Sequence, residues 1–188
     1  MGADFALTSS IGQENASIRL IGTQIPLCTD CRFLEWHRKT TSITDSGHSI
    51  SEIQHWISGA AATASALSAA AGKTATYSGG LIGAVAGGGM LQEKTGSFDA
   101  RVQFGVSAYQ VQNFSADFDG SRYSGASGLT PNNTVFDVTG SSGTRTLQAG
   151  GYFFGSATRG NAPPDIGGHF EVTGHGYHAA GVFAGSQR

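Results

Sequence analysis

Two cysteines that stand close together offer the most recognisable chemistry in this sequence. The run Cys28-Thr29-Asp30-Cys31 has the spacing of a redox-active pair, and together with His37 it supplies part of a zinc site. Redox chemistry of this kind needs a βαβ context, and a structural zinc site needs four ligands; neither pattern surrounds the pair. We therefore favour a local disulfide, typical of an exported protein, over reduced thiols, metal binding or redox activity.

Histidines are the second source of chemistry. The six are His37, His48, His55, His169, His175 and His178. The run from Gly174 to His178 predicts a hairpin tip that carries two imidazoles and the phenol of Tyr177. Because imidazole and phenolate both ligate haem iron, haem capture at this tip is one hypothesis, and ordinary solvated loop histidines are the alternative.

No arrangement of residues in the sequence indicates catalysis. The run Gly87-Gly88-Gly89 lacks the Gly-Lys-Ser/Thr that follows a phosphate-binding loop. The run from Thr139 to Gly143 is a flexible turn rather than a nucleophile elbow, and Asp117 and Asp119 divide between a strand and a turn. We therefore predict that the protein is not an enzyme and has no resident metal.

Composition excludes several classes of function. The 188 residues carry a net charge of -2, and the basic residues are scattered, so nucleic acid is not an expected partner. The longest apolar stretch, from Ala60 to Ala71, is alanine and serine, which predicts no membrane span. The first residues lack a signal peptide, so we interpret the chain as a fragment of an exported bacterial protein, located at the cell surface or outside the cell.

Alternating aromatic residues and glycine-rich turns predict an all-β fold. Glycine occurs 29 times and aromatics make up 10% of the chain, which suits close-packed strands. The expected strands are 74–85, 96–105, 108–118, 121–127, 133–139, 145–155, 165–173 and 177–185. Eight such strands match a small closed antiparallel barrel whose interior is filled by side chains, so function must lie on loops or on the outer surface.

Alternation within the strands predicts which residues face inward. Phe98, Ala100, Val102 and Phe104 share one face of their strand. In the next strand Tyr109 and Val111 have one parity and Phe114, Ala116 and Phe118 the other, so we expect a bulge near Gln112 or Asn113. Ile166, Gly168, Phe170 and Val172 are expected to face inward, with His169 and Glu171 on the solvent side. The dipeptide Asp119-Gly120 predicts a tight hairpin turn.

The first 58 residues predict a smaller, mostly β segment. Asp4–Ser9, Ser17–Thr23 and Arg32–His37 have the character of strands. A capping-box pattern at Ser49–Glu52, followed by apolar residues at helical spacing, favours a short helix that ends near Gly59, although its last residues fit a strand as well. Residues 59–73 are expected to connect this segment to the barrel of residues 74–188 and to lie against it without forming a helix.

The C-terminal motifs resemble the barrel domain of transferrin-binding protein B. They are Gly150–Gly155, Asp165–Phe170 and Ala180–Gly185, and the resemblance extends back over residues 74–188, with Asp165 near a position where that family often has Glu. The resemblance implies a bacterial cell-surface or outer-membrane protein that takes part in iron acquisition. It also implies that residues 1–58 are a reduced form of the handle sheet that precedes such barrels.

Three hypotheses for function follow. The first is a non-enzymatic binding module that recognises a host or environmental ligand such as an iron-carrier protein, through loop residues that favour adaptable contacts. Its expected contact residues are Arg122, Tyr123, Arg159, Asn161, His175, Tyr177 and His178. The second is a structural or export-recognition barrel of a larger surface protein, and the third is a haem carrier. A contiguous apolar or aromatic patch at one barrel end would favour binding, and a uniformly polar exterior would favour the structural role.

Overall fold

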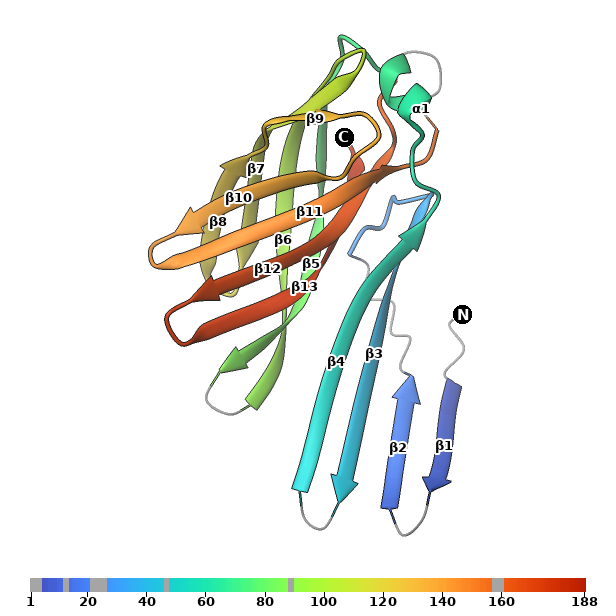
Figure 1. Ribbon diagram of the computed structural model, residues 1–188, viewed down its shortest axis with the longest axis vertical. Helices are drawn as coiled ribbons and strands as arrows, with labels where there is room; N and C mark the ends of the chain where they lie inside the picture. The colour runs from blue at the N-terminus through green and yellow to red at the C-terminus, as the bar shows by residue number, and fades with distance from the viewer. Residues whose placement is uncertain (1–4, 12–13, 21–26, 46–47, 88–89, 157–160) are drawn as a thin grey trace.

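The protein folds into a β-barrel with a smaller N-terminal sheet beside it (Figure 1). The structure is a computed structural model that describes all residues except 1–4, 12–13, 21–26, 46–47, 88–89 and 157–160. The N-terminal sheet contains β1 (Phe5–Ile11), β2 (Glu14–Leu20), β3 (Leu34–Asp45) and β4 (His48–Gly59), and α1 (Ala64–Ala69) follows it. The remaining strands are β5 (Thr74–Gly87), β6 (Met90–Phe104), β7 (Ala108–Phe118), β8 (Ser121–Ala126), β9 (Leu129–Pro131), β10 (Phe136–Ser142), β11 (Arg145–Phe154), β12 (Asp165–Gly174) and β13 (Tyr177–Gln187).

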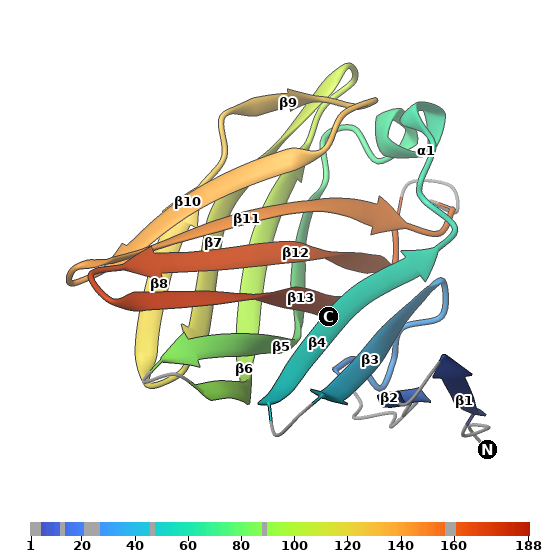
Figure 2. The ribbon, with the colours of Figure 1, turned by 60° about the horizontal axis from the view of Figure 1, so that its bottom comes forward.

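The barrel closes because β6 pairs with β7. The strands follow the order β6-β5-β13-β12-β11-β10-β8-β7, every neighbouring pair is antiparallel, and the β6–β7 pairing joins the two ends of this series. The short strand β9 lies outside the ring and pairs with the first residues of β7, next to the point where β8 leaves it (Figure 2). The predicted eight-stranded antiparallel barrel is therefore confirmed.

Aromatic side chains fill the barrel. The largest fully buried ones are Tyr77, Tyr109, Tyr123, Phe98, Phe104, Phe114, Phe118, Phe136, Phe170 and Phe183. Phe153 sits among four other rings, with centroid separations between 5.1 Å to Tyr109 and 5.8 Å to Phe136. Edge-on contacts of this kind add to the free energy gained by burying the rings. The inward faces predicted around Phe98 and Phe170 are confirmed, and His169 and Glu171 face solvent.

Two local details of the barrel also follow the sequence. Arg101 pairs with Asn113 and Val102 pairs with Val111, so Gln112 is the extra residue of a bulge that changes the parity of β7, as predicted. Asp119 and Gly120 both adopt positive φ angles, 45° and 72°, which is the backbone of the tight turn that an Asp-Gly pair favours.

The helix expected over residues 50–57 is wrong, because this segment forms β4. β4 pairs with β3 along its whole length, from Asp45 opposite His48 to Leu34 opposite Gly59. Ile53 and Ile57 are four residues apart, and that spacing places them on one face of a strand as well as on one face of a helix. Hairpin pairing with β3 decides the outcome. The strands expected near the N-terminus correspond to β1, β2 and β3.

The connector between sheet and barrel contains the helix α1, which the sequence analysis did not expect. Alanine favours helix, and the Thr63 hydroxyl caps the first turn by accepting a hydrogen bond from the Ala66 N–H at 3.2 Å. Leu67 and Ala70 are buried against the barrel core. These two residues supply the anchoring contact that the alanine-rich sequence did not indicate, and they hold the connector against the barrel as expected.

The N-terminal sheet packs on the outer wall of the barrel through a second apolar cluster. Leu27 and Leu34 pack with Ile82 of β5 and Val182 of β13, and all four are at most 6% exposed. Gly167 of β12 makes room for this contact, because a Cβ atom there would collide with Leu34 and lie 3.2 Å from the Ile57 side chain. The sheet and the barrel therefore share one apolar interface rather than being joined by the connector alone.

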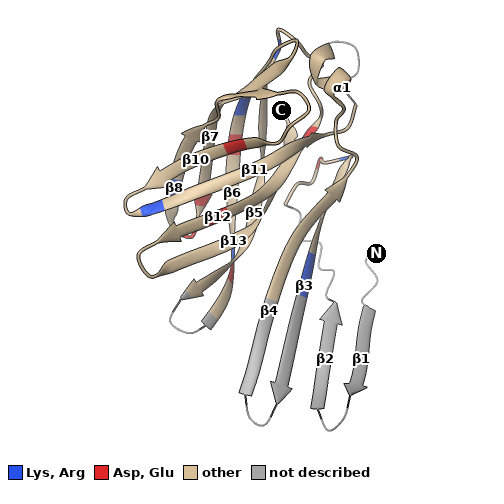
Figure 3. Cartoon of the chain, viewed as in Figure 1, with Lys and Arg blue, Asp and Glu red and all other residues tan. Residues whose placement is uncertain are grey.

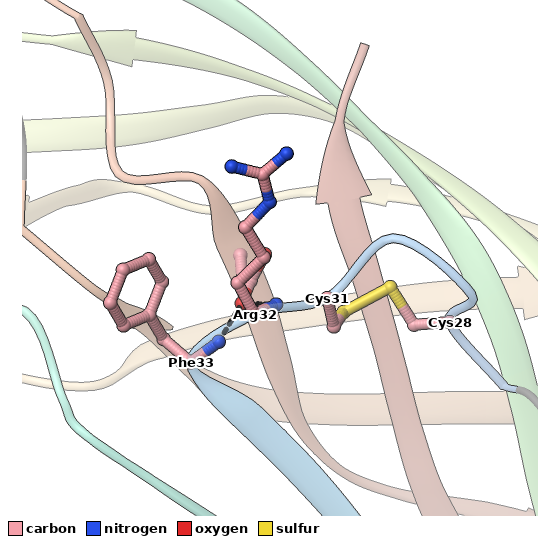
Figure 4. Close-up of a disulfide and its surroundings, with 5 residues drawn as sticks. Cys28, Cys31, Arg32 and Phe33 are labelled. Carbon is pink, nitrogen blue, oxygen red and sulfur yellow. Dashed lines mark hydrogen bonds between the residues drawn. A yellow bond between two sulfur atoms is a disulfide. The ribbon is translucent and has the colours of Figure 1, made fainter.

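A buried carboxylate adds a polar link between the two parts. Asp165 at the start of β12 is fully buried, and its Oδ2 accepts hydrogen bonds from the backbone N–H groups of Arg32 at 2.8 Å and Phe33 at 2.6 Å. Arg32 and Phe33 directly follow Cys31, which forms a disulfide with Cys28 (Figure 4). This disulfide confirms the predicted pairing of the two cysteines. Asp165 therefore ties the disulfide turn to the barrel.

Replacing Asp165 with alanine should lower the free energy of unfolding by about 2 kcal/mol, because two buried backbone donors lose their acceptor. The Asp165→Asn variant keeps an acceptor oxygen and should lose less. Chemical denaturation of both variants measures the effect, and Asp99→Ala is the matched control, since the Asp99 side chain forms an exposed ion pair with Arg188 and no other ion pair with the described residues. Equal losses for Asp165→Ala and Asp99→Ala would contradict the role assigned to Asp165.

Candidate functional site

The barrel has two chemically different ends. The turns that join β7 to β8, β10 to β11 and β12 to β13 lie together at what we call the turn end (Figure 1). The opposite end, which we call the helix end, carries α1, the β6–β7 turn, the β9 segment and the β11–β12 connection. Since aromatic side chains fill the interior, any ligand has to meet one of these ends or the outer wall.

The structure distributes the contact residues predicted from sequence between these ends and the core. Arg122, His175, Tyr177 and His178 come together at the turn end, whereas Asn161 is exposed in the β11–β12 connection at the helix end. Arg159 lies outside the described residues. Tyr123 is fully buried in the barrel core, so its prediction as a surface contact is wrong. Strand alternation after the Asp119-Gly120 turn sends Arg122 outward and Tyr123 inward.

Tyr177 closes the turn end rather than offering a free phenol. Its hydroxyl donates to Asp119 Oδ2 at 2.9 Å, and the guanidinium carbon of Arg145 lies 3.6 Å from the centre of its ring. Burial, followed by the hydrogen bond to Asp119, raises the pKa of the Tyr177 phenol far above its usual value. A phenolate suited to bind iron is therefore strongly disfavoured at this position.

The other polar side chains of the turn end are engaged with neighbours on the outer wall. His178 Nε2 lies 2.9 Å from Glu171 Oε1, and both side chains are about half exposed. Arg122 donates to the Ser115 hydroxyl at 3.1 Å and stands 4.0 Å from Asp117. Among the described residues, no group of three or more histidine, cysteine, aspartate or glutamate side chains could hold a metal ion.

A pocket of about 280 Å³ lies at the helix end. Its walls come from four segments of the chain: the connector and α1, the start of β7, the turn between β9 and β10, and β11. The lining residues are Ala61, Ala62, Ala64, Leu67, Tyr109, Asn132, Asn133, Thr134, Tyr152 and Phe153. None of these residues is ionisable except through a tyrosine hydroxyl, so the pocket is apolar with a few neutral polar groups.

Asn132 is the buried polar group of this pocket. Its Nδ2 donates to the backbone carbonyl of Val106 at 3.0 Å and lies 3.0 Å from the Ser68 Oγ. Those contacts fix the amide orientation, because a carbonyl accepts only from the NH₂ side. The Oδ1 atom of Asn132 is buried and has no hydrogen-bond partner among the described residues. A buried acceptor without a donor costs free energy, and this atom has almost no surface open to the pocket.

Exposed apolar side chains border the pocket. Val106 is 76% exposed, Leu129 is 77% exposed and Tyr152 is 50% exposed, and we call these three residues the helix-end rim. Residues 59–72, 105–110 and 126–136 at this end carry no charge, whereas the exposed Lys73 and Asp137 directly follow two of these segments and Arg159 belongs to the β11–β12 connection (Figure 3). The turn end, by contrast, carries Asp119, Arg122, Arg145 and Glu171. The two ends thus differ in charge as well as in shape.

Sequence reasoning missed the helix-end pocket almost entirely. Tyr152 belongs to the aromatic run that predicted the barrel. Strand alternation places Tyr152 on the outer face of its strand if Phe153 faces the core, and this is the one signal in the sequence that could have pointed to the pocket. Nothing in the sequence joins Asn132 to Ala61 or Leu67, because the contacts depend on how the connector folds back over the barrel. Of the contact residues predicted from sequence, only Arg159 and Asn161 belong to the connection at this end, and Asn161 does not line the pocket.

A third polar cluster links the N-terminal sheet to the barrel. Glu93 of β6 lies 2.6 Å from Arg38 Nε and 3.0 Å from His55 Nε2, and the His55 side chain is 2% exposed. Burial lowers the pKa of His55 below its usual value, and the hydrogen bond to Glu93 only partly opposes this effect. His55 is therefore held in its neutral form at the interface.

Acidification should weaken the folded state through His55. His55 binds a proton more readily in the unfolded chain than in the folded protein, because its pKa is lowered on folding. The stability that neutral His55 contributes is therefore complete above about pH 6.5, the pKa of a free histidine, and is lost as the pH falls through the lowered pKa of the folded protein. Denaturation between pH 7.5 and 5 should show a smaller loss of stability for His55→Gln than for the wild type. The exposed His169→Gln variant should follow the wild type; a steeper loss in His55→Gln would contradict this assignment.

At the turn end, Tyr177→Phe should lower the free energy of unfolding by about 1 kcal/mol, because Asp119 loses its donor while the ring stays under Arg145. Thermal unfolding checks the change. Tyr152→Phe is the matched control, since the Tyr152 hydroxyl makes no hydrogen bond with the described residues, and it should leave the midpoint unchanged. An unchanged midpoint in Tyr177→Phe would show that the hydrogen bond from Tyr177 to Asp119 does not stabilise the turn end.

Comparison of the chain with protein-family models found no match, and comparison with curated protein sequences found none either. The described residues contain no helix of the length and apolarity that crossing a bilayer requires.

Proposed function

We propose that this chain is a non-enzymatic binding module of a bacterial cell-surface or secreted protein, and that the helix end of the barrel is its recognition surface. The observation that carries the proposal is the contrast between the two barrel ends. One end gathers the exposed Val106, Leu129 and Tyr152 around a pocket whose lining residues carry no charge. Exposed apolar groups concentrated in one place are typical of a protein-interaction site.

Two further observations support an exported binding role. The Cys28–Cys31 disulfide is characteristic of oxidising compartments outside the cytosol. The filled barrel interior provides a rigid base for the surface segments, and such a base lowers the entropy lost when loops contact a partner. The resemblance of residues 74–188 to transferrin-binding protein B makes a host iron-carrier protein the first partner to test.

The alternatives predict different surfaces. A structural or export-recognition barrel needs no apolar patch, so the helix-end rim disfavours it. A haem carrier at the turn end would need the phenol of Tyr177 or free imidazoles. Tyr177 donates its proton to Asp119, and His178 contacts Glu171, which leaves His175 with no described partner. We therefore place a protein partner first, and haem after it.

The test measures binding of the immobilised protein to iron-loaded transferrin by surface plasmon resonance. The double variant Leu129→Ser/Tyr152→Ser should weaken binding at least about tenfold, because exposed aromatic and apolar anchors contribute most of the binding energy. The matched control is Arg122→Ala/His175→Ala, which removes equally exposed side chains at the turn end. Its affinity should stay within about twofold of the wild type.

Three outcomes would contradict the proposal. Loss of binding in the turn-end variant alone would move the recognition surface to that end. A flat response with every iron-carrier protein tried would remove the proposed partner class. Titration of haem into the metal-free protein is the companion measurement, and a saturable Soret shift lost in His175→Ala/His178→Ala would favour the haem carrier instead.

A further inference from the structure

We propose that the Cys28–Cys31 disulfide is a redox-sensitive clasp, and that its reduction to two thiols lets the N-terminal sheet leave the outer wall of the barrel while the barrel stays folded. Residues 27–34, which contain the disulfide and lead directly into β3, are called the clasp segment. This role does not depend on the partner proposed above, because it concerns the junction between the two parts of the protein.

The clasp segment is attached to two strands of the barrel. The Leu27 carbonyl accepts a hydrogen bond from the Gly80 N–H of β5 at 2.7 Å. The Asp165 carboxylate of β12 accepts from the N–H groups of Arg32 and Phe33. Since β13 lies between β5 and β12, the segment crosses β13 on the outside of the barrel and is fixed on both sides of it.

The disulfide stands between these two attachments. Cys28 directly follows Leu27, and Cys31 directly precedes Arg32. The bond holds the Cα atoms of the two cysteines 5.5 Å apart, and without it the turn between them has more conformations. Reduction therefore raises the entropy lost when both attachments are in place at the same time.

The same segment carries the hairpin of β3 and β4. The Phe33 carbonyl accepts from the Ala60 N–H at 3.0 Å, just after the end of β4. Leu34 begins β3 and is buried in the apolar cluster that contains Ile82 of β5 and Val182 of β13. Loosening of the clasp segment thus acts on the strands that cover the barrel wall.

The disulfide is open to a reductant. Both cysteines are half-buried, and Thr29 and Asp30 between them are exposed, so an incoming thiolate can reach the bond from solvent. The cysteines are only three residues apart in sequence. A disulfide that closes so short a ring adds less to folded stability than one that closes a long loop, and by linkage the fold protects it less from reduction.

The redox step uses a dithiol as the reductant. One thiolate of the dithiol attacks a cysteine sulfur, the S–S bond breaks, and a mixed disulfide forms. The second thiolate of the dithiol then displaces the remaining cysteine as a thiolate. The protein has gained two electrons, both cysteines take up protons from water, and the reagent leaves as its own disulfide. Because the two thiols stay close in sequence, a disulfide oxidant can reverse the step.

The barrel has its own means of staying closed after reduction. Its eight strands form a complete ring of pairings in which the clasp segment takes no part. The connector also keeps its attachments, since the Ala62 N–H donates to the Phe153 carbonyl at 2.8 Å and Leu67 is buried in the barrel core. The sheet would therefore remain tethered through the connector and expose the apolar wall around Ile82 and Val182.

The first test measures access to the covered wall with iodoacetamide. Val182→Cys places a thiol under the sheet, and Val172→Cys places one inside the barrel as the matched control. Each is made with the disulfide intact and with Cys28→Ser/Cys31→Ser. Loss of the disulfide should speed alkylation at position 182 at least about tenfold and leave position 172 within about twofold. Equal rates at position 182, or equal acceleration at both positions, would overturn the proposal.

The second test uses the unaltered protein and excess dithiothreitol. Reduction should speed hydrogen exchange of the Phe33 and Gly80 N–H groups at least about tenfold, leave the N–H groups between β10 and β11 unchanged, and be reversed by reoxidation. A disulfide that yields to dithiothreitol only when the barrel unfolds would contradict the redox role. Faster exchange at Phe33 and Gly80 without faster alkylation at position 182 would show that the turn loosens alone, which also contradicts release of the sheet.

Discussion

Hydrogen bonding between β6 and β7 turns an open sheet into a closed ring, and the other features of the protein depend on that closure. A closed ring of eight strands has an interior just wide enough for side chains, and here the interior is filled by aromatic rings. A filled barrel has no lumen in which to hold a ligand. Any ligand would therefore have to contact the ends or the outer wall, and the chain builds each of these surfaces differently.

The N-terminal sheet covers the side of the outer wall that β5, β12 and β13 form. An apolar cluster around Leu34 and Ile82, the buried Asp165 and the ion cluster at Glu93 all cross the same junction. Apolar burial supplies most of the attraction, while the two polar contacts fix the position of the sheet, because hydrogen bonds demand specific geometry. The helix end carries Val106, Leu129 and Tyr152, the most exposed large apolar side chains among the described residues of the barrel, and a pocket beside them.

Much of the barrel could be predicted from sequence because its strands carry their own alternation. The run from Phe98 to Phe104 specifies one inward face, and the change of parity at Gln112 could be read as a bulge before any pairing was known. The segment 50–57 could not be resolved in the same way. Ile53 and Ile57 satisfy two periodicities at once, and only pairing with β3 selects the strand.

The candidate site was harder to predict for a different reason. Loop residues such as His175 and Arg122 attract attention in a sequence by their chemistry, yet their side chains lie at an end that Tyr177 closes. Asn132 and Tyr152 are ordinary in sequence, and their significance comes from four distant segments that meet at α1. Alternation could have excluded Tyr123, since it directly follows the outward Arg122. Distances between segments could not be obtained from spacing alone.

The position of β13 has a consequence for the order of events during biosynthesis. β13 lies between β12 and β5, so the barrel wall keeps a gap until residues 177–187 have been made and have paired with a strand from the start of the barrel. Contacts so distant in sequence form slowly, because a long loop must close first. Until residues 177–187 have left the ribosome, β5 and β12 therefore each keep an unpaired edge.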